Sequence, residues 1–246
     1  MNDILSTIHQ LEAEIEAALE SYEQDERFDQ ALDSYRQVEG KLLALGLAPG
    51  EPGYQAQQSV LAYCLMRQAN LLRIAGQKGE ALALGQREIA AARASGDDLA
   101  LARSLLNLGA THIASGGLAQ GLEFTEEARA LFEKSDQPDY RQGLGWYWIL
   151  RADLLNLGYL PFAPGEVIAA ADQALAILLP LENFPGVARA YAALAKAHAA
   201  LNNLPAAEAD RQRRNAINNF PVAGASRVIK QPGRWKAACF NQTNYV

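Results

Sequence analysis

The sequence is poor in the β-branched residues that favour strands. Valine, isoleucine and threonine occur 7, 11 and 4 times in 246 residues. Alanine, leucine, glutamate and glutamine, which favour helices, dominate instead. A β-rich domain is therefore excluded, and an all-α fold is predicted. Half of the residues are hydrophobic, which is enough in a chain of this length to form a large core and excludes intrinsic disorder.

Long apolar runs and cysteine pairs are also missing. No stretch of about 18 apolar residues occurs, and acidic residues recur every few positions through the first twenty residues. We therefore expect neither a membrane span nor a secretory signal, and a cytoplasmic protein without a membrane partner. The two cysteines, Cys64 and Cys239, lie far apart and neither belongs to a CxxC pair, so a disulfide framework is not expected.

Patterns that carry catalysis are absent as well. The three histidines, His9, His112 and His198, lie far apart in the sequence, and phosphate-loop, dinucleotide and zinc patterns do not occur. We predict no catalytic residues, no metal site and no cofactor, and hence a protein that is not an enzyme.

Charge is distributed unevenly along the chain, although the net charge is only −6. Residues 1–40 contain eleven acids and two bases, which are Arg27 and Arg36. From residue 211 onward there is no acid, and the bases are Arg211, Arg213, Arg214, Arg227, Lys230, Arg234 and Lys236. One end of the chain is thus acidic and the other basic.

An internal repeat organises the chain. Four segments share a small residue, an apolar continuation and a final glycine or asparagine, and these final residues are Gly76, Gly116, Gly158 and Asn202. The small residues are Ala69, Gly109, Ala152 and Ala195, spaced by 40, 43 and 43 positions, with a weaker copy near Leu19. A second helix is predicted after each stop, beginning near residues 28, 80, 120, 166 and 206. Each unit is therefore predicted to be a helix-turn-helix hairpin whose small residue allows close helix contact.

These hairpins resemble the tetratricopeptide repeat. In the third copy, the signature positions hold Leu105, Leu108, Gly109, His112, Gly116, Leu118, Gly121 and Ala128. The period near 42 exceeds the usual 34 residues and is similar to the longer repeats of kinesin-light-chain-like and bacterial signalling proteins. The resemblance implies an α-solenoid of about five hairpins over residues 1–218, wound as a right-handed superhelix. His112 and His198 occupy the position of a packed aromatic, so we expect them between helices.

The resemblance also implies a function, which is binding a protein or peptide segment on the concave surface lined by the first helix of each hairpin. The positions that face this groove hold Tyr63, Arg67, Asn70, Arg73, Arg103, Asn107, Trp146, Asp153, Arg189 and Lys196. Arginines combined with Tyr63 and Trp146 suit an acidic or amphipathic peptide. We expect Arg103 and Trp146 to stand on the open wall. Asn70 and Asn107 also match two asparagines of a carboxylate-binding subfamily, but its cation positions hold Met66, Trp146 and Leu150.

The segment over residues 219–246 lacks a helical period and is interpreted as a basic tail, extended or capping. Its alternative role is contact with nucleic acid, using its bases together with Trp235 and Phe240. The tail would either cap an apolar face left by the last repeat, giving a monomer, or support weak, salt-dependent head-to-tail self-association. In the loop from Gly158 to Gly165, we expect Tyr159 and Phe162 to pack rather than contact a partner.

Overall fold

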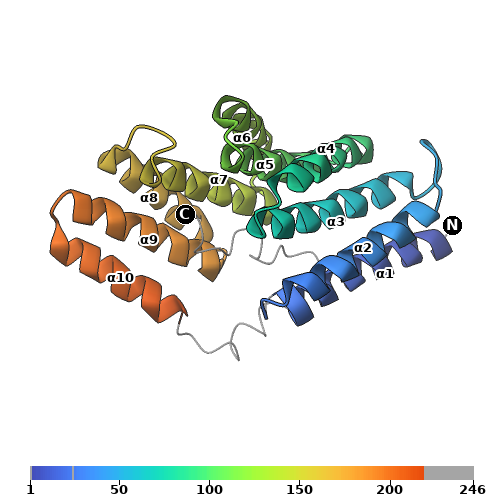
Figure 1. Ribbon diagram of the computed structural model, residues 1–246, viewed down its shortest axis with the longest axis horizontal. Coiled ribbons are helices and arrows are strands. Elements are labelled where there is room, and N and C mark those ends of the chain that lie inside the picture. The colour runs from blue at the N-terminus through green and yellow to red at the C-terminus, as the bar shows by residue number, and fades with distance from the viewer. Residues whose placement is uncertain (1, 24, 219–246) are drawn as a thin grey trace. The chain divides into compact units, whose positions relative to one another are not determined.

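The computed structural model describes residues 2–23 and 25–218, and over this range the chain is helical without strands (Figure 1). Within the described residues, ten α-helices form five hairpins: α1 (Asn2–Ala18) with α2 (Phe28–Ala44), α3 (Tyr54–Ile74) with α4 (Lys78–Ser95), α5 (Asp98–Ala114) with α6 (Leu118–Phe132), α7 (Pro138–Asn156) with α8 (Pro164–Leu178), and α9 (Phe184–Ala200) with α10 (Leu204–Asn218). A short π-helix, η1 (Leu19–Glu23), extends α1. The predicted all-α class and the hairpin pattern are confirmed.

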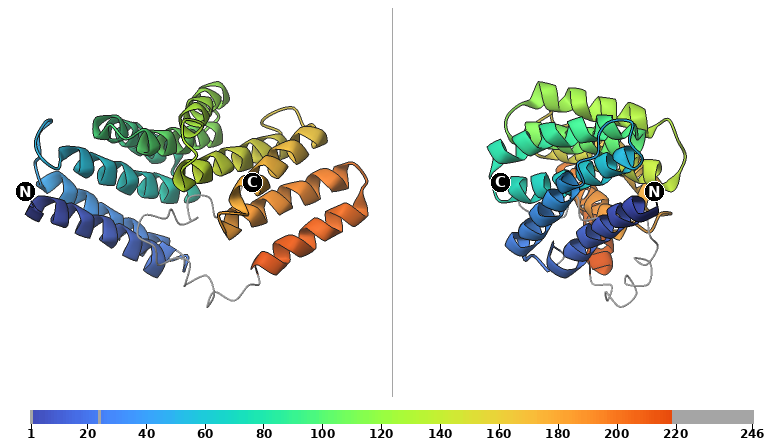
Figure 2. Two further views of the ribbon diagram at one scale, coloured as in Figure 1. Left: turned by 180° about the vertical axis from the view of Figure 1, so that it is seen from behind. Right: turned by 90° about the vertical axis from the view of Figure 1, so that its right-hand side faces the viewer.

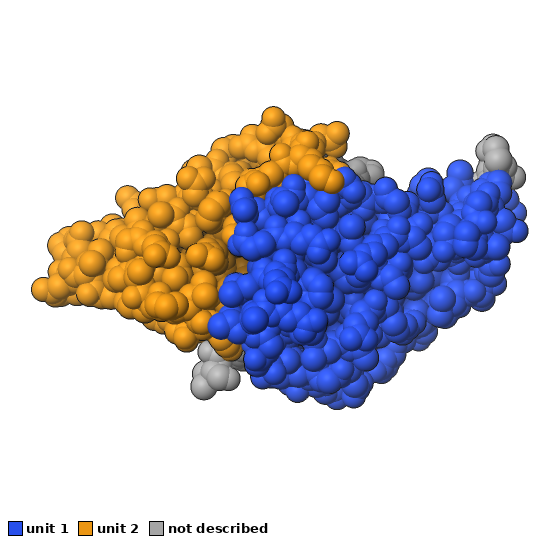
Figure 3. Space-filling view, turned by 90° about the horizontal axis from the view of Figure 1, so that it is seen from above, with its two compact units in different colours: residues 1–131, 238–246 blue, residues 132–237 orange. Residues whose placement is uncertain are grey.

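Two compact units make up the described chain (Figure 3). The first holds α1 to α5 and α6 up to residue 131, and the second begins at residue 132 and holds α7 to α10. In the first unit, α2 packs between α1 and α3, α4 packs between α3 and α5, and α3 contacts both α1 and α5. In the second unit, α8 packs between α7 and α9, α10 packs on α9, and α7 contacts α9 (Figure 2). First helices of successive hairpins are thus neighbours within each unit, as in a helical repeat.

The helix stops predicted from the sequence are confirmed, and a side chain caps the start of α5. The four predicted stops, Gly76, Gly116, Gly158 and Asn202, all adopt positive φ directly after a first helix. This conformation lets the chain reverse into the second helix. Asp97 caps α5, because its carboxylate accepts a hydrogen bond from the Leu99 amide at 2.8 Å.

The predicted small residues lie at buried helix contacts. Ala69, Gly109, Ala152 and Ala195 are all buried. At Gly109, an added Cβ atom would lie 2.6 Å from Thr125 Cγ2 and 2.8 Å from the carbonyl oxygen of Gly121. Helices α5 and α6 therefore cross too closely for any larger side chain at residue 109, which confirms the predicted contact.

The last described helix has polar residues at several outward positions. Ala207 and Asp210 point inward from α10, whereas Glu208, Gln212 and Asn215 are exposed. Leu204, at the start of the helix, is also 58% exposed, and an apolar terminal face for the tail to cover stays a prediction. The predicted tail over residues 219–246 lies outside the described part of the chain.

The loop between α7 and α8 also differs from the expectation. Tyr159 and Phe162 are 37% and 46% exposed, so the prediction that they pack is wrong. The amide of Leu160 donates to the carbonyl of Leu154 at 3.1 Å, which turns the loop back over the end of α7. Leu160 is half-buried, and the two rings on either side of it project outward.

Helices long and apolar enough to cross a membrane do not occur in residues 2–23 and 25–218.

Candidate functional site

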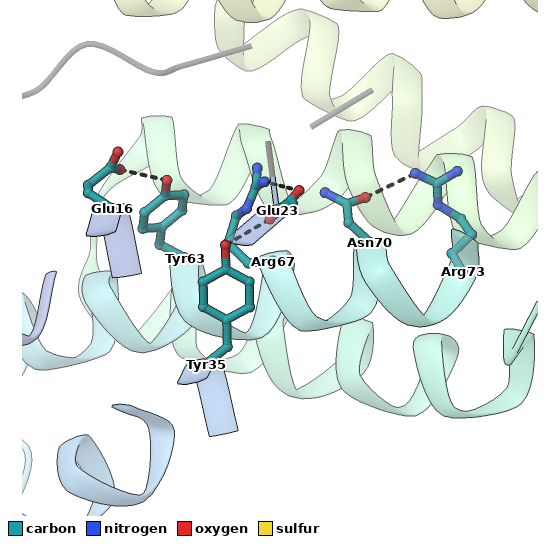
Figure 4. A network of polar contacts seen from close by, with 7 residues as sticks. All are labelled: Glu16, Glu23, Tyr35, Tyr63, Arg67, Asn70 and Arg73. Carbon is teal, nitrogen blue, oxygen red and sulfur yellow. Dashed lines mark hydrogen bonds and ion pairs between the residues drawn. The ribbon is translucent and has the colours of Figure 1, made fainter. Parts of the chain in front are cut away.

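A buried ion pair lies on the face of α3 that the sequence assigns to the groove (Figure 4). The guanidinium of Arg67 pairs with Glu23, and the Tyr35 hydroxyl donates to Glu23 Oε2 at 2.7 Å. Arg67 is 0% exposed, and Glu23 and Tyr35 are also buried. Burial raises the pKa of the Tyr35 hydroxyl, which therefore acts as a donor to the carboxylate. The π-helix η1 places Glu23 in this contact, at the end of the first helix.

The other predicted residues of α3 are hydrogen-bonded on both sides of this pair (Figure 4). The Tyr63 hydroxyl donates to Glu16 Oε1 of α1 at 2.7 Å. Arg73 Nη2 donates to Asn70 Oδ1 at 3.0 Å. Asn70 and Arg73 are buried, and Asn70 Nδ2 has no hydrogen-bond partner in the described part of the chain. Carboxylates of the first hairpin thus hold Tyr63 and Arg67.

Helix α5 contributes Arg103 and Asn107. Asn107 is buried, and its Nδ2 donates to Glu88 Oε2 of α4 at 2.9 Å. Arg103 is half-buried. The Asn107 Nδ2 donor bonds to Glu88 and so contributes to the contact between α4 and α5. In this structure the donor therefore binds a carboxyl group of the chain itself and does not play the part of the carboxylate-binding asparagines.

The second unit brings its four predicted residues onto α7 and α9. Arg189 of α9 pairs with Asp153 of α7, and its guanidinium carbon lies 5.8 Å from the centre of the Trp146 ring. The Asp153 and Arg189 side chains remain 24% and 19% exposed. The exposed Lys196 donates from Nζ to the backbone carbonyl of Asn156 at 2.6 Å, across the ends of the same two helices.

Burial divides the ten predicted groove residues into two groups. Trp146 is 4% exposed and lies beneath the Arg189 guanidinium, so its expected place on an open wall is wrong. Arg67, Asn70, Arg73 and Asn107 are also buried, and a hydrogen bond to a neighbouring side chain offsets the cost of burying each of them. The half-buried or exposed members are Tyr63, Arg103, Asp153, Arg189 and Lys196. Contact between any of these residues and a peptide remains a prediction.

His112 and His198 lie between the two helices of their hairpins, as the resemblance implies. The His112 ring of α5 is 5.4 Å from the Phe124 ring of α6, and burial lowers the pKa of His112. His198 Nδ1 of α9 lies 2.8 Å from Asp210 Oδ2 of α10. Arg213 donates to the other oxygen of the buried Asp210 at 2.9 Å.

Several acids in these contacts were missed by sequence reasoning, namely Glu16, Glu23, Glu88 and Asp210. Glu88 and Asp210 fall on buried positions of predicted helices, and an acid at such a position is itself a signal for a buried partner. The partners could not be assigned from sequence, because Glu23 and Arg67 are 44 residues apart.

The remaining reactive groups offer little chemistry. Burial raises the pKa of the Cys64 thiol to about 12, which disfavours the nucleophilic thiolate. Among the residues that the structure describes, no three histidine, cysteine or acidic side chains group as metal ligands. Two bases of the predicted basic end are paired within α10: Arg211 with Glu208, and Arg213 with Asp210.

No protein-family model matches the sequence, and no curated protein matches it significantly. Solved structures do show similarity. BtubC (BKLC) from P. vanneervenii is 14% identical, with a TM-score of 0.58 over 95% of this chain and 96% of that chain.

Two further structures share the architecture. A putative kinesin light chain from Podosopora anserina with TPR-like repeats is 18% identical, with a TM-score of 0.50 over 86% of this chain and 96% of that chain. Aspartyl phosphate phosphatase F from Bacillus subtilis is 15% identical, with a TM-score of 0.55 over 87% of this chain but only 61% of that chain. The chain therefore has the all-α fold of tetratricopeptide-type helical-repeat proteins.

Proposed function

We propose that the chain is a protein-binding scaffold that takes an acidic peptide segment of a partner on the α7–α9 face of the second unit. The observation that carries the proposal is the partly exposed Arg189–Asp153 pair stacked on Trp146. A guanidinium held on an aromatic ring is fixed in orientation, and the fork of its N–H donors matches the two-point geometry of a carboxylate.

Spacing along α9 indicates what such a ligand would need. Arg189 and Lys196 are seven residues apart and thus lie on one side of the helix, about 10 Å from each other along its axis. A peptide with two acidic side chains at that separation would meet both cations. Its carboxylate would replace Asp153 as the partner of Arg189, and the partly exposed Asp153 side chain would have to turn to water for this exchange.

The same fold in BtubC and in a putative kinesin light chain is consistent with a scaffold, although similarity at 14% to 18% identity concerns architecture alone. We include Tyr63 and Arg103 of the first unit as a second, weaker contact region, because they are the predicted residues there that are not fully buried.

Site-specific photo-crosslinking tests the proposal. A crosslinking residue at position 196 should capture partner proteins from a nuclease-treated lysate, and the same residue at position 214, on the outer helix α10, should not. Replacing Arg189 and Lys196 with alanine should abolish capture of the partner proteins. Because position 196 is then alanine, the crosslinking residue replaces Asn156 in this measurement. The matched control, Arg211→Ala with Arg214→Ala, removes the same charge and should retain capture.

Equal capture at positions 196 and 214, or equal loss in both double variants, would show that the α7–α9 face is not the binding site. Loss of all capture on nuclease treatment would instead support the nucleic-acid role predicted for the basic end.

A further inference from the structure

A carboxyl group that has no cation partner among the described residues is enclosed between α4 and α5. Glu88 of α4 is 0% exposed. Its Oε2 accepts a hydrogen bond from Asn107 Nδ2 at 2.9 Å, and the Ser104 hydroxyl also bonds to the carboxyl group. Two acceptors in the same contact, Glu88 Oε1 and Asn107 Oδ1, have no partner among the described residues.

The charged groups on the helices around Glu88 do not neutralise it. On α3, Arg67 pairs with Glu23, and Arg73 bonds to Asn70. The other charged or titratable side chains of the packed helices are Tyr54, Tyr63 and Cys64 on α3, Lys78, Glu80, Arg87 and Arg93 on α4, and Asp98, Arg103 and His112 on α5. Burial is the largest influence on the Glu88 pKa, opposed only by the hydrogen bonds from Asn107 and Ser104.

We propose that Glu88 is a neutral carboxylic acid in neutral solution and that its Oε1–H donates to Asn107 Oδ1. The acid and the amide then form a two-point pair, with Asn107 Nδ2–H donating to Oε2 and Glu88 Oε1–H donating to Oδ1. This arrangement satisfies both acceptors that are otherwise unpartnered, whereas an ionised carboxylate would leave a buried negative charge beside a bare carbonyl oxygen. Burial raises the pKa of Glu88 to about 8, in the direction that the pairing requires.

This assignment makes the contact between the second and third hairpins sensitive to pH. The folded chain holds the Glu88 proton more tightly than the unfolded chain, in which the carboxyl has its ordinary pKa of 4.5. The stability from protonation is therefore fully present below about pH 4.5, falls as the pH rises, and is lost once the pH passes about 8. Above that pH the carboxylate loses its hydrogen bond to Asn107 Oδ1, and the α4–α5 contact loosens.

The test compares wild-type protein with Glu88→Gln in urea unfolding from pH 5 to pH 9. Glutamine reproduces both hydrogen bonds of the neutral acid but cannot ionise. The unfolding equilibrium constant of the wild type should rise relative to that of the variant by about tenfold per pH unit up to pH 8, and then level off. Glu80→Gln, an exposed change on the same helix, is the matched control and should show no such trend. A wild-type to Glu88→Gln ratio that stays constant over this range overturns the proposal.

Infrared spectroscopy of the wild type gives a second readout that does not depend on the variant folding. With glutamate side chains labelled at the carboxyl carbon, a protonated carboxyl stretch should persist at pH 7 and disappear above pH 8. Absence of that band at pH 7 shows an ionised Glu88 and overturns the proposal.

Discussion

Replacing Gly109 with alanine tests the close crossing of α5 and α6 that organises the third hairpin. The new Cβ would lie 2.8 Å from the Gly121 carbonyl oxygen, a backbone atom that cannot rotate away, and 2.6 Å from Thr125 Cγ2. The helices must therefore separate, and overpacking of this kind costs about 1 to 3 kcal/mol. Alanine regains about 0.5 to 1 kcal/mol of helix propensity over glycine. The middle of the two ranges gives a net destabilisation of about 1 kcal/mol, because the steric cost exceeds the gain in propensity.

Gly40→Ala is the matched control, since Gly40 also lies inside a helix but has nothing within 4 Å of an added Cβ. Only the propensity gain applies there, so this variant should be more stable by about 0.5 to 1 kcal/mol. In a thermal melt followed by circular dichroism, a chain of this size shifts by about 2 to 4 °C per kcal/mol. Gly109→Ala should thus melt below the wild type and Gly40→Ala above it. Equal melting temperatures in the two variants would refute the close crossing.

Three further predictions concern buried charge and the chain end. Arg67→Met should lower the free energy of unfolding by about 3 to 5 kcal/mol in urea titrations, because Glu23 would stay buried without its cation. Adding Glu23→Gln should recover most of that loss. A double variant that is as unstable as the single one would contradict the pairing. Asp210→Ala removes the bridge between His198 and Arg213, so hydrogen exchange in α10 should accelerate while exchange in α7 stays as in the wild type. Because α10 has polar residues at several outward positions, deletion of residues 219–246 should leave the melting temperature unchanged. A lower melting temperature would show that the tail caps the array, and association at low salt that disappears on truncation, followed by sedimentation, would show end-to-end contact.

The hairpins could be predicted from sequence because their signals are local. Gly76 and Asn202 stop helices through their own backbone conformation, and this preference acts within a few residues. The small residues at Gly109 and Ala152 repeat at a nearly constant interval, so a single register accounts for several contacts. Both kinds of signal are independent of where the rest of the chain lies.

The burial of the candidate site residues could not be predicted in the same way. A helical repeat determines which side of a helix a residue lies on, but not whether neighbouring side chains cover it. Trp146 was expected on an open wall, but it is 4% exposed and the Arg189 guanidinium covers its ring. The π-helix at Leu19–Glu23 had no sequence signal, yet it places the partner of Arg67. Burial of these polar groups depends on side-chain pairs between helices, such as Arg67 with Glu23, which are 44 residues apart, and Arg189 with Asp153, which are 36 apart.

These side-chain pairs follow a pattern that helps to keep neighbouring hairpins from sliding along each other. Within the two units, an acid contacts the first helix of the next hairpin at three junctions: Glu23 with Arg67, Glu88 with Asn107, and Asp153 with Arg189. Helix contacts lined by alanine and glycine slide more readily than those with large interlocking side chains, since they present few protruding groups. A buried acid penalises any shifted packing, because displacement would leave it without its partner. The Asp153–Arg189 pair differs from the other two in being partly exposed, so water could solvate Asp153 if a ligand carboxylate took its place on Arg189. This difference is the physical reason for placing the proposed binding site on the second unit.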